Sequence, residues 1–141
     1  EPAAGLTRGL LTYLCDAYHE ETGTDAKGNE KTRTLLKLNP KFSPYKAAIL
    51  PLVKKDGLPD AARDIVKQFL KHGLSVRYDE QHSIGKRYSR HDEVGTPYCL
   101  TVDHDTLQDG CVTIRDRDTT KQERISIEAA VKTVQERIAN A

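Results

Sequence analysis

Apolar residues recur at strand-like and helix-like spacings from about residue 45 to the end of the chain. The uninterrupted apolar run at 47–53 is typical of a strand that is covered on both faces. Apolar positions at helical spacing follow it, and Pro59 and Gly73 suit the start and the end of that helix. The same patterns predict further strands at 75–79, 98–102, 111–115 and 122–127, a helix at 83–93 and a C-terminal helix from Ile127 to Ile138. This order predicts an α/β fold in which helices pack on a mixed five-stranded sheet with a right-handed parallel crossover.

The N-terminal part of the chain has a different pattern. Residues 6–18 place apolar side chains along one stripe of a predicted helix. The next segment, 19–32, is polar, contains two glycines and predicts a loop, whereas 33–38 predicts a short strand. A proline-marked segment follows, where we place a boundary between two domains, 1–40 and 41–141.

Composition excludes several classes of protein. The 22 basic and 21 acidic residues nearly cancel, so any positive surface for a polyanion has to be local. No apolar run approaches the roughly 20 residues that a membrane span needs. Three cysteines without a Cys-x-x-Cys pair suit reduced thiols in the cytoplasm, and five histidines without ligand spacing predict no metal site. The chain lacks Met and begins at Glu1, so we expect a C-terminal piece of a longer polypeptide.

Charge is concentrated on the predicted helix at 83–93. One side of this helix is apolar or aromatic and consists of Ile84, Tyr88 and His91. The opposite side is charged and consists of Lys86, Arg90 and Glu93, with Arg87 between the two sides. From the residues alone, the charged side is either a solvated face with an Arg90–Glu93 pair or a surface for nucleic acid. We expect His91 to be packed and hydrogen-bonded.

Arg8 lies in the first turn of the predicted N-terminal helix. A cation at that position opposes the helix dipole, so it does not serve helix stability. It is either a solvated surface arginine or, together with the helix N-terminus, a partner for a phosphate.

Five short segments between residues 45 and 141 carry most of the recognisable motifs. They are LPLVKK at 50–55, YDE at 78–80, SIGKRY at 83–88, DEVGTPY at 92–98 and VTIRDRD at 112–118. In this order they resemble the anticodon-binding domain of class II glycyl-tRNA synthetases. Residues 1–8, EPAAGLTR, resemble motif 3 of the catalytic domain in the same family. The resemblance implies a three-layer sandwich with about three helices on the mixed sheet, preceded by a helix and strand of a class II catalytic domain.

The resemblance also implies roles for the N-terminal residues and for a longer parent enzyme. Arg8 corresponds to the catalytic arginine that contacts ATP phosphate, and Glu1 to the glutamate that holds the amino group of glycine. Ala3 departs from the family, which usually has a serine there. The parent would use ATP and Mg²⁺ to activate glycine, transfer it to tRNA(Gly) and form a homodimer. Because motifs 1 and 2 are missing, we expect these 141 residues alone to be inactive.

The expected partners of residues 41–141 are the anticodon loop of tRNA(Gly) and the rest of the catalytic domain. We expect no membrane partner and no DNA partner. Unstacked anticodon bases expose edges and phosphates that charged side chains can contact. The predicted contact residues are Lys86, Arg87 and Arg90 for phosphates and base acceptors, Glu93 and Asp116 for cytosine amino groups, and Arg115 and Arg117 for base edges or phosphates. Two alternatives stay open: a non-catalytic module like the accessory subunits of mitochondrial DNA polymerase, or a related synthetase for proline, threonine or histidine.

Overall fold

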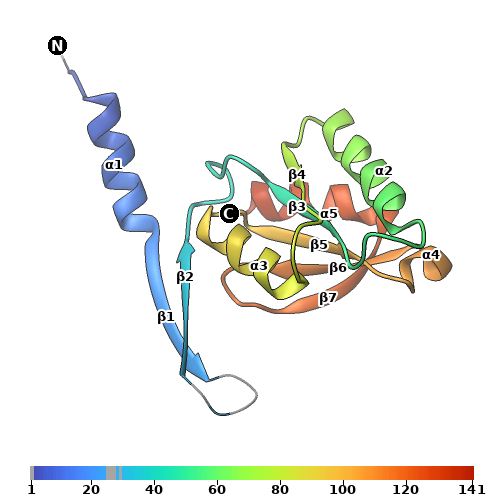
Figure 1. Ribbon diagram of the computed structural model, residues 1–141. Coiled ribbons are helices and arrows are strands. Elements are labelled where there is room, and N and C mark those ends of the chain that lie inside the picture. The colour runs from blue at the N-terminus through green and yellow to red at the C-terminus, as the bar shows by residue number, and fades with distance from the viewer. Residues whose placement is uncertain (1, 25–27, 29) are drawn as a thin grey trace.

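A mixed five-stranded sheet organises most of the chain. The computed structural model describes residues 2–24, 28 and 30–141, and in it the strands follow the order β4-β3-β5-β6-β7 (Figure 1). Strand β3 pairs in parallel with both β4 and β5, and the remaining pairs are antiparallel. The strands are β3 (Ala47–Pro51), β4 (Val76–Tyr78), β5 (Tyr98–Val102), β6 (Cys111–Asp116) and β7 (Gln122–Ser126). The predicted α/β fold with a mixed five-stranded sheet is confirmed.

Helices cover both faces of this sheet and make three layers. Helices α2 (Leu58–Lys71) and α5 (Ile127–Ala139) pack on one face, where Ala47 and Ile49 of β3 point. Helix α3 (Ile84–Glu93) covers the other face, towards which Ala48 and Leu50 point. Each fully buried Leu, Ile or Phe side chain in these layers contributes about 1.5–3 kcal/mol to stability. The continuous apolar run of β3 therefore reflects burial on both faces, as predicted.

Local sequence signals set the ends of the helices. Pro59 lies in the first turn of α2, where its missing N–H has no partner to lose. Ser126 is the N-cap of α5, and its hydroxyl accepts a hydrogen bond from the N–H of Ala129 at 3.2 Å. A short helix, α4 (Thr106–Asp109), lies between β5 and β6, and Asp103 accepts hydrogen bonds there from Thr106. Asp103 thus serves the turn before α4.

The N-terminal region contains a helix and a separate two-stranded hairpin. Helix α1 (Leu6–Ala17) leads into β1 (Tyr18–Thr24), which pairs antiparallel with β2 (Glu30–Leu36). The loop predicted at 19–32 is therefore wrong over most of its length, and residues 25–27 and 29 of it lie outside the described residues. Most side chains of these strands are exposed, so the hairpin is held mainly by main-chain hydrogen bonds. Its sequence therefore lacks the alternation of apolar and polar residues by which a strand is predicted.

Helix α1 projects away from the sheet and leaves its apolar stripe uncovered (Figure 1). Leu6 is 89% exposed, and Leu10 and Leu11 are more than half exposed. Within the described residues, no helix is long and apolar enough to cross a membrane, and no group of three or more side chains suits a metal ion. All three cysteines are free thiols, as predicted.

Candidate nucleic-acid interface

Helix α3 presents two charged side chains to solvent while its opposite side packs on the sheet. Lys86 in its first turn and Glu93 at its end are both exposed. They are seven residues apart, or about 10 Å along the helix axis. Ile84 and Tyr88 pack against the apolar face of the sheet, and the Tyr88 hydroxyl lies 2.7 Å from Oγ1 of Thr101. The amphipathic character predicted for this helix is present.

Arg87 lies on the buried side of α3, only 2% exposed, and not between the two sides as the spacing predicted. Its Nη1 donates to the carbonyl oxygen of Pro51 at 2.6 Å and to that of Asp79 at 3.3 Å. Its Nη2 donates to the carbonyl oxygen of Leu52 at 3.2 Å. These carbonyls lie at the ends of β3 and β4, so Arg87 links two strand ends. Few of its N–H groups remain available to an external ligand.

Arg90 pairs with a buried acid and not with Glu93. Its Nη1 lies 2.6 Å from Oδ2 of Asp79, and about a third of the Arg90 side chain stays exposed. Burial raises the pKa of Asp79, but the N–H of Gln81 and the charge of Arg90 outweigh it, so the pKa lies below its usual value. Arg90 is thus partly committed to the fold and partly available at the surface.

His91 is packed, as predicted, but its ring nitrogens form no hydrogen bond with the described residues. Nε2 approaches Oδ2 of Asp79 only to 3.4 Å. Burial lowers the pKa of His91 by more than Asp79 raises it. The histidine is therefore a neutral core residue at pH 7.

Asp92 is the centre of a buried ion cluster between α3, β6 and the hairpin. Arg115 donates to both of its oxygens, at 2.9 and 3.0 Å, and the Arg115 guanidinium also stacks over the Tyr88 ring at 4.8 Å. Arg33 of β2 reaches the same carboxylate at 3.4 Å and the carbonyl oxygen of Arg117 at 2.9 Å. The cluster holds the hairpin against α3. The Arg115 N–H groups that we expected to contact RNA are hydrogen-bonded to Asp92 instead.

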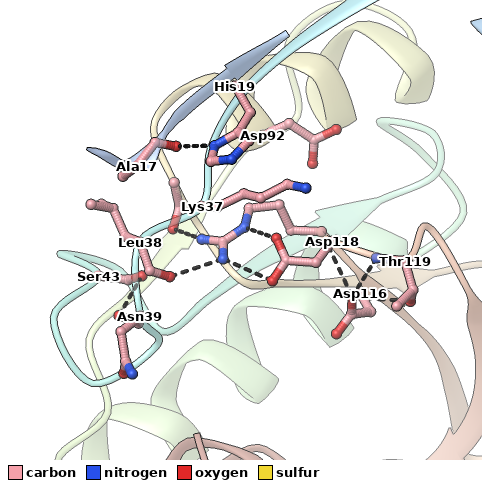
Figure 2. A network of polar contacts seen from close by, with 12 residues as sticks. Ala17, His19, Lys37, Leu38, Asn39, Ser43, Asp92, Asp116, Asp118 and Thr119 are labelled. Carbon is pink, nitrogen blue, oxygen red and sulfur yellow. Dashed lines mark hydrogen bonds and ion pairs between the residues drawn. The ribbon is translucent and has the colours of Figure 1, made fainter. Parts of the chain in front are cut away.

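Arg117 is also enclosed by the protein and is 2% exposed. Its guanidinium donates to the carbonyl oxygens of Gly95 and Leu38, each at 2.9 Å, and to the carboxylate of Asp118. Figure 2 shows Leu38 and Asp118 turned towards this one guanidinium. Asp116 caps the following turn, because its Oδ1 accepts from the N–H groups of Asp118 and Thr119. These two predicted contact residues thus have structural partners.

A polar groove of about 440 Å³ runs between the hairpin and α3. Hydroxyl groups and charged side chains line its walls, and the Asp92 cluster lines its floor. The walls include Gly23, Lys31 and Thr32 from the hairpin and Gly85, Ser89 and Glu93 from α3. The sequence pattern does not reveal this groove, because it predicts a loop at 19–32. The one signal for it is Arg33, next to that polar segment.

The structure does not bring all the predicted residues together. Glu93 lines the groove, whereas Lys86 is not among its lining residues. Arg8 is exposed on α1, in a hollow with Ala3 and Gly5, away from α3 (Figure 1). Glu1 lies outside the described residues.

The family model of the anticodon binding domain matches residues 46–137. This chain belongs to that family. The match begins just before β3 and ends in α5, so it covers the whole five-stranded sheet and all three layers. In this anticodon-binding domain, the hairpin wall of the groove lies outside the matched residues and the α3 wall lies inside them.

Curated relatives extend the similarity to the N-terminal region. The chain is 49% identical over 138 residues to the glycine–tRNA ligase of Rhodopirellula baltica, which covers 98% of the chain. It is 52% identical over 128 residues to that of Cutibacterium acnes and 45% identical over 139 residues to that of Thermobifida fusca, covering 91% and 99% of the chain. The chain spans 26%, 27% and 30% of the length of these three relatives.

Proposed function

We propose that this chain recognises the anticodon loop of tRNA(Gly) as part of a glycine–tRNA ligase. The observation that carries the proposal is the anticodon-binding family match over 46–137, together with 45–52% identity to glycine–tRNA ligases over nearly the whole chain. The names of these relatives favour the ligase over a polymerase accessory module or a synthetase for another amino acid.

The proposed contacts lie on the exposed side of α3. Lys86 and the exposed part of Arg90 suit phosphates or base acceptors, and Glu93 suits the amino group of a cytosine. The other predicted contact residues act indirectly in this proposal, by holding the strand ends, the turn and the hairpin in place. They are Arg87, Arg115, Asp116 and Arg117.

A binding measurement tests this proposal. The chain should bind a labelled tRNA(Gly) anticodon stem-loop in fluorescence anisotropy, and more weakly when the anticodon cytosines are replaced by uracils. Lys86→Ala should lower the affinity and reduce the slope of log affinity against log salt by about 0.7–0.9, the share of one phosphate contact. Lys71→Ala, an equal charge change at the end of α2, is the matched control. Equal binding of the stem-loops with and without cytosines would contradict the proposal.

The activity of the longer protein is part of the same proposal. There, glycine would react with ATP in the presence of Mg²⁺, and Arg8 and Glu1 would contact ATP phosphate and the glycine amino group. We also propose a homodimer in the cytoplasm, where free thiols are stable. Arg8→Ala in the longer protein should slow glycine-dependent ATP–pyrophosphate exchange by at least about 100-fold, as loss of a transition-state charge contact does. Near-normal exchange would remove Arg8 from the active site.

A further inference from the structure

Two glycines lie on opposite walls of the groove between the hairpin and α3. Gly23 belongs to β1, and Gly85 lies in the first turn of α3. Glycine weakens both helices and strands, because it loses more backbone freedom on folding than any other residue. A glycine in either kind of element therefore calls for a reason.

The fold explains some glycines of this chain but neither of these two. Gly95 needs to be glycine, because its φ is +79° and an added Cβ would lie 2.7 Å from Cδ1 of Leu38. Gly23 and Gly85 have no positive φ, and among the residues that the structure describes an added Cβ would meet nothing within 4 Å at either position. Alanine would suit the isolated fold better at both positions. Gly9 of α1 shares these two properties, but Gly23 and Gly85 both line the groove, where the space that they leave is open to a ligand.

We propose that this groove holds one unstacked nucleotide of the anticodon loop and that Gly23 and Gly85 leave the space for it. The inference rests on the proposed function and adds the place where a nucleotide binds. A volume of about 440 Å³ lies within the range of roughly 300–1,000 Å³ that is usual for small-ligand sites.

The chemistry of the walls matches a nucleotide. Lys31 on the hairpin offers a cation for a phosphate, and the hydroxyl of Thr32 suits the sugar or the base edge. The hydroxyl of Ser89 donates to the carbonyl oxygen of Gly85 at 3.2 Å and can still accept a hydrogen bond from the nucleotide. Glu93 at the other wall accepts from an exocyclic amino group. The floor is already neutralised, because Asp92 is paired with Arg115. It therefore supports the walls without repelling a phosphate.

Alanine substitutions test the inference. Gly85→Ala and Gly23→Ala should each raise the melting temperature of the 141-residue chain by about 1–4 °C, because alanine is the better residue for the free fold. Both should weaken binding of the tRNA(Gly) anticodon stem-loop by about tenfold or more, the effect of one methyl group in a filled site. Gly9→Ala is the matched control. Gly9 is also helical, and an added Cβ would meet none of the described residues within 4 Å, but Gly9 lies in α1, outside the groove. It should raise the melting temperature and leave the dissociation constant within about twofold.

The outcomes separate this inference from the proposed function. If the wild-type chain binds the stem-loop and both groove variants bind equally well, the groove holds no nucleotide and only the further inference is lost. A lower melting temperature for the groove variants would show that the fold itself needs these glycines, and this also overturns the inference. If the wild-type chain does not bind the stem-loop at all, the proposed function fails and the inference fails with it.

Discussion

The two sides of helix α3 carry similar charges in opposite environments. Lys86 and Arg87 are neighbouring cations, and Asp92 and Glu93 are neighbouring acids. In each pair one residue is exposed and the other is at most 2% exposed, because one step along a helix turns the side chain by about 100°. The buried members have protein partners at hydrogen-bond distance. The exposed members, Lys86 and Glu93, have side chains that solvent can reach. Charge density alone therefore does not locate the side of the domain that we propose binds RNA.

The strongest test of this difference is to remove the buried acid. Asp92→Asn takes the negative charge away from the buried guanidinium of Arg115 and from the partly buried guanidinium of Arg33. Breaking one member of a buried ion pair typically costs about 3–5 kcal/mol, so we expect a loss of that size in the free energy of unfolding, measured with urea. Glu93→Gln, at the neighbouring exposed position, should change it by less than about 0.5 kcal/mol. Equal losses for the two variants would contradict the assignment of sides.

The neighbouring cations provide a second, smaller contrast. Arg87→Ala leaves the carbonyl oxygens of Pro51, Leu52 and Asp79 without this donor, and we expect a loss of about 2–3 kcal/mol in the same urea titration. Lys86→Ala should stay within about 0.5 kcal/mol of the wild type. A stable Arg87→Ala chain would show that these strand ends hold together without the guanidinium.

These contrasts also explain how far the sequence alone could lead. The strand and helix order was predictable because apolar periodicity is a local property, and five strands of the sheet carry it. The burial of Arg117 was not predictable in this way, because its partner at Leu38 lies 79 residues away in the chain. The predicted strand at 33–38 overlaps β2, which ends in Leu35 and Leu36, but the hairpin was missed because β1 and the first half of β2 are polar and lack period-two alternation. The domain boundary near residue 40 and the roles of Glu1 and Arg8 stay predictions.

Acid should act on the buried side of α3 through His91. The charged groups around its ring are Asp79, Arg77 and Arg90, and burial keeps the pKa of His91 below its ordinary 6.5. The unfolded chain therefore takes up this proton first as the pH falls through about 6.5, and folding stability decreases by up to about 1.4 kcal/mol per pH unit until the folded state titrates too. His91→Asn should flatten this slope below about pH 6.5. A wild-type slope that survives in His91→Asn would place the titrating group elsewhere.

The smallest effect on stability should come from the exposed side, where the effect on binding should be clear. Lys86→Gln with Glu93→Gln removes one positive and one negative charge, so the net charge of the chain stays at +1. Neither side chain is buried, and we expect the free energy of unfolding to change by less than about 0.5 kcal/mol. Binding of the tRNA(Gly) anticodon stem-loop should nevertheless weaken, and the preference for cytosine over uracil should shrink, because the amino group loses its acceptor. Since net charge is constant, a change in long-range attraction cannot produce this result. A destabilised double variant would show instead that the exposed side supports the fold, and the distinction between the two sides of α3 would no longer hold.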